Sequence, residues 1–190
     1  MTAVSNTMTD TPDLPITPTA RFLTAALVFA PLIYLVADST YAVRGWDDPT
    51  AGVIHVLGAI AYGFVVLAIA SRLPANSTLA LWIVVVGLIG MAGNVAYGFD
   101  TIHTSLGDVP LVDRSGAAIL IKPLGLFFPL SLALIAYALS KLAHRRQAVL
   151  VAIAAIAWPI AHIGNFAAVA VPVNIALAIA LGSLVWPQRS

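Results

Sequence analysis

The chain contains no cysteine and no glutamate, and only 9% of its 190 residues are charged. Without cysteine the protein forms no disulfide, uses no thiolate nucleophile and holds no iron–sulfur cluster or cysteine-ligated zinc. Without glutamate it lacks the Glu-x-x-His motif of di-metal carboxylate sites. A soluble domain carries roughly 25% charged residues, so the low charge content excludes an ordinary soluble core.

Hydrophobic residues make up 61% of the chain and form about six long runs. A helix needs about 20 apolar residues to cross the hydrocarbon core of a membrane. The sequence therefore predicts an all-α integral membrane protein, a bundle of six transmembrane helices. The expected spans are 22–37 (reaching 43 if Asp38 is sheltered), 51–70, 78–99, 117–140, 149–168 and 172–186. The last two are close enough to predict a tight hairpin that turns near Val171 and Pro172.

The first segment differs in composition from the rest of the chain. Residues 1–19 are rich in threonine and proline and carry two aspartates before the first cation. A secretory signal would begin with a positively charged region, so we expect a short disordered cytoplasmic tail here. Residues 20–187 are expected to form a single six-helix domain.

The loops differ in their content of lysine and arginine, which concentrate on the cytoplasmic side of membrane proteins. The cations on the side of the N-terminus are Arg21, Arg72, Lys141, Arg145, Arg146 and Arg189. The opposite loops hold only Arg44 and Arg114. We therefore expect both termini in the cytoplasm, and the plasma or inner membrane as the location.

Polar side chains interrupt four of the predicted helices at similar depth. At 1.5 Å per residue they lie roughly 6–12 Å below the outer surface. Such groups are costly in lipid and usually face a bundle interior or a cavity. We therefore expect an outward-facing polar pocket in the outer leaflet. The candidate ligand-binding residues are His55, Asn94, Lys122, Trp158, His162 and Asn165.

The densest group of candidates lies in the fifth predicted span. His162 and Asn165 are three residues apart and are expected to share one helix face, with Trp158 one turn earlier. Each candidate also has a structural interpretation. Hydrogen bonds between helices would explain the histidines and asparagines without a ligand, and Lys122 could be an anchor that reaches the headgroups.

Three further candidates are expected in or next to the outer loops: Asp38, Asp100 and His103. The i, i+3 spacing of Asp100 and His103 puts both on one face if the helix continues. A carboxylate and an imidazole so arranged can bind a divalent metal, or act as a base and its orienting group. A solvated loop is the alternative interpretation.

The chain has no nucleotide-binding loop, zincin motif or hydrolase elbow, and no basic stripe for nucleic acid. We predict a protein that binds or transports a small ligand without catalysis, alone, as a homo-oligomer or within a larger membrane complex. One alternative is a haem-binding subunit with His55 and His162 as axial ligands. The others are an intramembrane enzyme that uses a histidine as general base on a lipid, and an accessory or scaffold subunit.

Overall fold

A computed structural model describes residues 17–186, and every regular element in that range is helical. Within this range six helices are long and apolar enough to cross a membrane. They are α1 (Pro18–Arg44), α2 (Pro49–Ala70), α3 (Thr78–Ser105), α4 (Ile121–Lys141) together with the 3₁₀ turn before it, α5 (Arg145–Ile163), and α6 (Ala167–Gly182) together with the 3₁₀ turn after it. Three short 3₁₀ helices accompany them: η1 (Leu111–Asp113), η2 (Gly116–Leu120) and η3 (Ser183–Val185).

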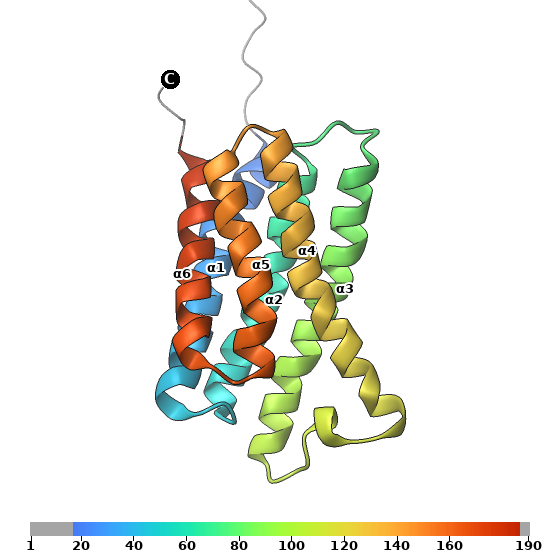
Figure 1. The fold of residues 1–190 in the computed structure, drawn as a ribbon, viewed down its shortest axis with the longest axis vertical. Helices are drawn as coiled ribbons and strands as arrows, with labels where there is room; N and C mark the ends of the chain where they lie inside the picture. Colours follow the sequence, from blue (N-terminus) through green and yellow to red (C-terminus); the bar gives the residue numbers. More distant parts are fainter. Residues whose placement is uncertain (1–16, 187–190) are drawn as a thin grey trace, which may run out of the picture.

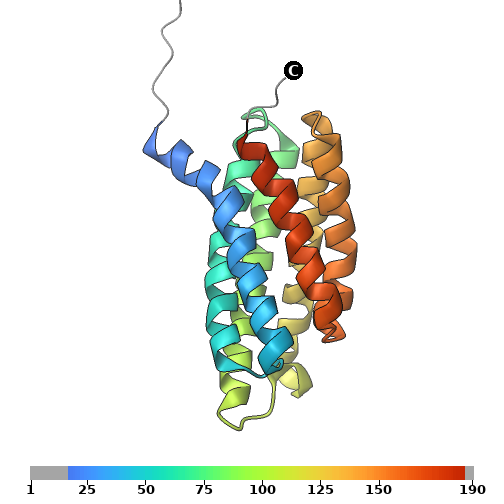
Figure 2. The ribbon, with the colours of Figure 1, turned by 90° about the vertical axis from the view of Figure 1, so that its left-hand side faces the viewer.

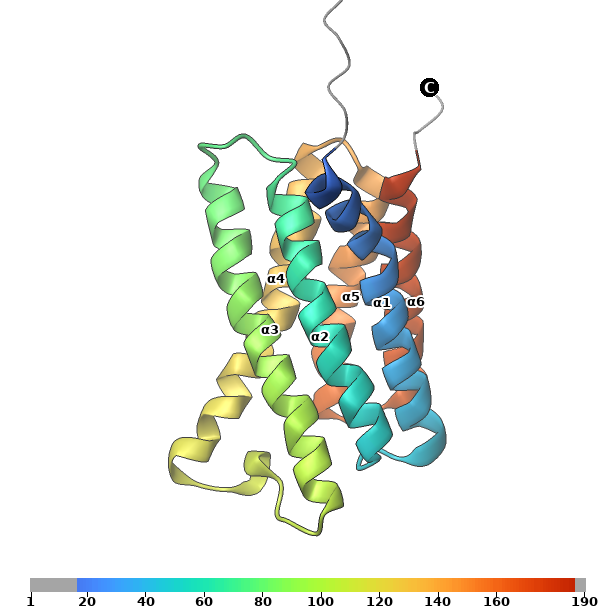
Figure 3. The same ribbon diagram turned by 180° about the vertical axis from the view of Figure 1, so that it is seen from behind.

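The helices run alternately up and down and form a closed ring. Each packs against its neighbours in the chain, and α6 returns to lie beside α1. Seen from the front and from behind, α4–α6 form one layer and α1–α3 the other (Figures 1 and 3). Large buried side chains such as Tyr34, Tyr62, Leu132 and Leu177 fill the space between the layers.

Local sequence explains where three of the helices begin. Thr17, Asp48 and Ser77 each accept a hydrogen bond from the amide three residues later, which satisfies one free N–H of the first turn. Proline follows Thr17 and Asp48 directly, at a position where its missing amide costs nothing. Pro31 lies inside α1, which is visibly bent (Figure 2), because proline removes one bond of the helical ladder.

The long apolar helices agree with the predicted segments in number and approximate position, but the third predicted segment, 78–99, ends too early. α1 continues through Asp38 to Arg44, as expected for a sheltered Asp38, because the carboxylate is buried inside the bundle. α3 continues to Ser105, beyond the apolar run. At the other end of α1, residues 18 and 19 belong to the helix and not to the tail, and residues 1–16 lie outside the described residues.

The prediction of a hairpin turn near Val171 and Pro172 is wrong. The chain turns at residues 164–166, and Pro172 lies inside α6. Asn165 adopts a left-handed conformation with φ 55°, and the Phe166 amide donates to the Ala161 carbonyl at 2.8 Å. This is the Schellman arrangement, in which Asn is the usual substitute for Gly. It ends α5 five residues before the predicted end.

The cationic residues gather as the loop analysis predicted. Within the described chain, Arg21, Arg72, Lys141, Arg145 and Arg146 lie at or next to the helix ends on the side of both termini (Figure 1). Arg44 and Arg114 lie at the opposite end, and Arg189 falls outside the described residues. The opposite end is called the outer end below, following the predicted orientation.

Candidate functional site

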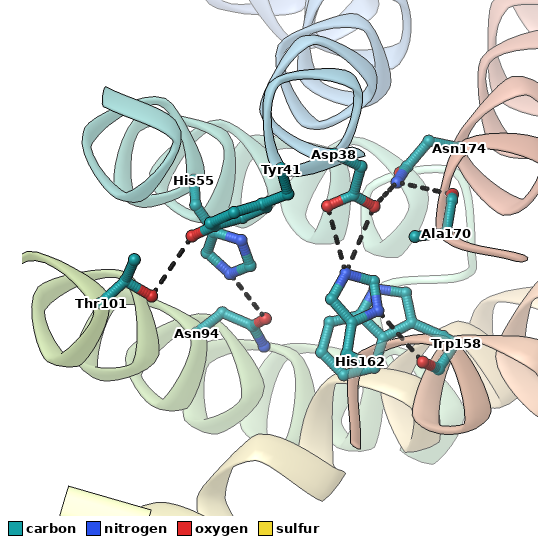
Figure 4. Close-up of polar contacts among 9 residues, drawn as sticks. All are labelled: Asp38, Tyr41, His55, Asn94, Thr101, Trp158, His162, Ala170 and Asn174. Atoms are coloured by element: carbon teal, nitrogen blue, oxygen red, sulfur yellow. Dashed lines mark hydrogen bonds and ion pairs between the residues drawn. The ribbon is translucent and has the colours of Figure 1, made fainter. Parts of the chain in front are cut away.

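The carboxylate of Asp38 is the centre of a buried polar cluster in the outer half of the bundle (Figure 4). Its side chain comes from α1 and is fully buried. The His162 Nε2 atom on α5 lies 3.3 Å from both carboxylate oxygens. The Asn174 amide on α6 donates to Asp38 Oδ2 and also to the Ala170 carbonyl. One carboxylate therefore connects three helices.

This cluster explains how a charged residue persists inside an apolar helix. A lone carboxylate within a membrane is costly, and such groups pair with one another in the bundle interior. His162 is the only basic side chain that pairs with Asp38 among residues 17–186. Breaking a buried pair by removing one partner leaves the other uncompensated, so the three residues depend on one another.

A second set of hydrogen bonds links α2 and α1 to α3 (Figure 4). His55 Nε2 lies 3.3 Å from the side-chain oxygen of Asn94. The Asn94 amide donates to the Gly90 carbonyl at 2.9 Å, which fixes the orientation of that side chain. The Tyr41 hydroxyl donates to Thr101 at 3.3 Å. Polar groups from α1, α2, α3, α5 and α6 therefore meet at the same level.

Aromatic rings surround the two imidazoles. Trp158 stacks on His162 with ring centroids 3.9 Å apart and an interplanar angle of 15°. Trp46, in the loop between α1 and α2, approaches the same imidazole edge-on at 5.8 Å and stacks on Tyr41. The His55 and His162 rings lie 6.2 Å apart at 69°. The indoles and the carboxylate together hold His162 in one orientation.

A pocket of about 430 Å³ between α3, α4 and α5 reaches this cluster from the outer end. Its inner end is formed by Asn94, Trp158 and His162, which lie deepest along their helices. Asp113, Lys122 and Asn165 lie near the outer ends of their elements. The remaining lining residues are Tyr97, Val112, Ile121, Gly125, Leu126 and Ile163. The walls are thus largely apolar, with polar groups at both ends.

The structure brings four of the predicted ligand-binding residues together: His55, Asn94, Trp158 and His162. All four are buried. Lys122 is exposed and lies at the edge of the pocket.

The predicted sharing of a helix face by His162 and Asn165 is wrong. α5 ends at Ile163, and Asn165 lies exposed in the turn that follows. Asn165 still contributes to the lining of the pocket, next to its mouth.

Asp100 and His103 do not meet. The Asp100 carboxylate is buried and accepts a hydrogen bond from the Leu111 amide at 2.8 Å, so it holds the loop that follows α3. His103 Nε2 pairs instead with Asp108 at 3.0 Å. Within residues 17–186 no group of three histidine or acidic side chains could hold a metal ion.

Sequence reasoning missed Asn174, and it grouped Asp38 with the outer-loop candidates although it allowed the first span to continue past a sheltered Asp38; the residue lies buried inside α1. Asn174 is the only polar side chain in α6, and a lone polar residue in an apolar span is by itself a reason to look for a partner. Asp38 lies at the same depth on the helix that closes against α6. The sequence shows both residues, but it does not show that α6 packs against α1, which is the contact that brings them together.

The imidazoles do not fit the haem arrangement considered from the sequence. An iron between the rings needs one free nitrogen from each, and both Nε2 atoms face other partners, Asn94 and Asp38. His162 Nδ1 lies 3.1 Å from the Trp158 carbonyl, so of the four nitrogens in these two rings only His55 Nδ1 has no partner among residues 17–186. Ligation through His55 Nδ1 would leave its contact with Asn94 intact, but His162 would have to give up its contact with Asp38 or with the Trp158 carbonyl.

Comparison of the chain with protein-family models, with curated proteins and with solved structures found no match.

Proposed function

We propose that this protein binds a small ligand in the pocket between α3, α4 and α5, from the outer side of the membrane and without catalysis. The observation that carries the proposal is the 430 Å³ pocket that reaches His162 in an otherwise apolar bundle. Ligand sites are typically concave and mostly apolar, with a few polar groups that orient the ligand. Here the second N–H of the Asn94 amide, which bonds no described residue, is such a group.

The lining favours an amphiphilic ligand with one hydrogen-bonding headgroup. The walls are supplied by aliphatic side chains such as Ile121 and Leu126. At the inner end, Trp158 is buried and its indole N–H has no hydrogen-bond partner in the described part of the chain. A buried donor that bonds nothing is costly, so a headgroup that accepts a hydrogen bond would be stabilised there.

The pocket is better suited to one-sided binding than to conduction. Toward the cytoplasmic end, the interior between the helices is filled by aliphatic side chains, among them Ile69, Leu139, Val151 and Leu181. An apolar barrier of this kind offers no hydrogen-bonding route for a polar solute. A sensor, a receptor or the binding subunit of a larger complex fits this arrangement.

The proposal predicts that an amphiphile stabilises the protein only if no side chain fills the pocket. The thermal unfolding of protein in lipid nanodiscs would be measured with decanoate, decylamine, decanol and a decyl-substituted quinone. A ligand at 100 times its Kd stabilises the folded state by about 2.7 kcal/mol. A Cβ at Gly125 meets no atom within 4 Å although the residue lines the pocket, so Gly125→Trp fills the pocket without a backbone clash and should abolish the shift.

The matched control is Gly182→Trp, at the other end of the bundle, where a Cβ also meets no atom within 4 Å. It should keep the stabilisation. If no probe stabilises the protein, or if Gly125→Trp responds as Gly182→Trp does, the pocket is not a binding site for such molecules. The buried polar cluster would then serve only to hold the helices together, as in an accessory or scaffold subunit.

A further inference from the structure

The hydrogen bonds of His162 determine where its protons lie. The Nδ1 atom lies 3.1 Å from the Trp158 carbonyl, and a carbonyl oxygen can only accept, so Nδ1 carries a hydrogen. The Nε2 atom lies 3.3 Å from both oxygens of Asp38. In a neutral imidazole that atom would be a lone pair facing an acceptor-only carboxylate. A bonded pair therefore contains one additional proton, on Nε2 or on the carboxyl group.

The surroundings of Asp38 favour a pair without net charge. The residue is fully buried, and Asn174 donates to its Oδ2 atom, which leaves Oδ1 to share the proton with His162. With that proton, the pair is either imidazolium with carboxylate or imidazole with carboxylic acid. Loss of the proton leaves a buried negative charge with a lone pair facing it, which a membrane interior tolerates poorly.

A second proton acceptor lies beside the pair. Because the Asn94 amide donates to the Gly90 carbonyl, its side-chain oxygen accepts from His55 Nε2–H. His55 Nδ1 is then a lone pair, and it bonds to no group among residues 17–186. The His55 ring lies 6.2 Å from that of His162, so this lone pair belongs to the imidazole next to the pair.

The other titratable groups around the pair come from each layer of the bundle. Tyr34 and Tyr41 of α1 and Tyr97 of α3 lie with their ring centroids 4.9–6.0 Å from that of His55, and Tyr62 of α2 packs against Tyr34 at 5.2 Å. From α4, Lys122 faces the same pocket as His162, and Asp113 does so from the loop before it. α6 contributes only the uncharged Asn174. Among residues 17–186, Asp38 and His162 are thus the pair in this cluster in which a buried acidic side chain contacts a buried basic one.

We propose that Asp38 and His162 form a proton-binding site that exchanges one proton with the outer solution through the pocket. The proposal rests on the proposed function, because His162 both lines the pocket and bonds Asp38. When the proton leaves, it passes to water in the pocket and the pair changes from neutral to one negative charge. A molecule bound against His162 is then linked to this proton, since coupling between two sites is reciprocal.

Trp158 and the Asp38 carboxyl group report the two positions of the proton. An imidazolium stacked on an indole quenches its emission more strongly than a neutral imidazole does. A protonated carboxyl group shows a C=O stretch that a carboxylate lacks. With Trp46, Trp82 and Trp186 replaced by Phe, the emission of Trp158 would be followed against pH, together with the infrared difference spectrum. We expect emission to rise, or the carboxylic acid band to vanish, as the pH is raised.

Asp38→Asn should remove both signals, because the amide cannot hold the proton and a lone imidazolium is disfavoured there. Asp47→Asn, an exposed aspartate in the outer loop, should titrate as the parent protein does. Gly125→Trp should slow the response to a rapid pH change.

The proposal is overturned if neither signal changes with pH, if Asp38→Asn titrates as the parent does, or if Gly125→Trp responds at the parental rate. Titration without stabilisation by any amphiphile would refute only the proposed ligand. Stabilisation without titration would refute only the proton site.

Discussion

Asp38→Leu is expected to destabilise the bundle by about 3–5 kcal/mol, the cost of removing one member of a buried pair. The substitution leaves the His162 Nε2 atom and the Asn174 amide buried without their acceptor. Three helices lose their common contact at that level. The free energy of unfolding in mixed micelles, followed by far-ultraviolet circular dichroism, would measure the loss.

Two variants show whether the loss comes from the pair. Asp47→Leu removes an exposed outer-loop aspartate and should change stability by no more than about 0.5 kcal/mol. Leucine at positions 38, 162 and 174 together should recover much of the stability, since replacing a whole buried polar cluster by apolar groups is often neutral. Equal stability of Asp38→Leu and Asp47→Leu would show that the carboxylate does not hold the helices.

The second large effect is expected at the contact between α3 and α4. A Cβ on Gly93 would lie 2.5 Å from the carbonyl carbon and oxygen of Leu124, which are backbone atoms that cannot rotate away. Gly93→Val must therefore push the two helices apart and should cost about 1–3 kcal/mol, as overpacking does. Since both helices line the pocket, the substitution should also abolish stabilisation by the amphiphilic probes.

Gly125→Ala is the matched control on the facing helix. Its Cβ would meet no atom within 4 Å, and alanine favours helix over glycine by about 1 kcal/mol. This variant should be neutral or more stable, whereas Gly93→Ala should be less stable than the parent. Similar unfolding free energies for the two alanine variants would mean that the helices are not in backbone contact at Gly93.

The helices and the level of the polar cluster could be predicted from sequence because both follow from depth in a membrane. Long apolar runs give the number of spans, and counting residues from their ends puts His55, Asn94 and His162 at a common depth. Polar side chains at one depth on packed helices avoid lipid by facing the bundle interior, and there they meet one another. The cluster of His55, Asn94, Trp158 and His162 in the structure follows from that restriction.

Pairing between distant segments could not be predicted in the same way. The contact of Asp38 with Asn174 depends on α6 closing against α1, and hydropathy carries no information on which helices are neighbours. The turn at Asn165 was missed for a different reason. The Gly164-Asn165 pair is a helix stop signal. Because apolar residues continue beyond it to Pro172, hydropathy alone placed the end of the helix too late.

The most direct test of an outward-facing, water-filled pocket is the reaction of single cysteines with a membrane-impermeant thiosulfonate added to sealed cells. The chain has no cysteine of its own, so each label reports one position. Ala117→Cys in η2 at the outer end and Ala75→Cys in the loop at the opposite end, both exposed, establish the orientation.

Gly125→Cys in the pocket should react from outside as Ala117→Cys does, while Ala75→Cys reacts only after permeabilisation. Ile160→Cys, exposed on α5 and absent from the pocket lining, should stay unmodified because a thiol facing lipid does not ionise. Reaction of Gly125→Cys only from the cytoplasmic side, or no faster than Ile160→Cys, would contradict an outward-facing pocket.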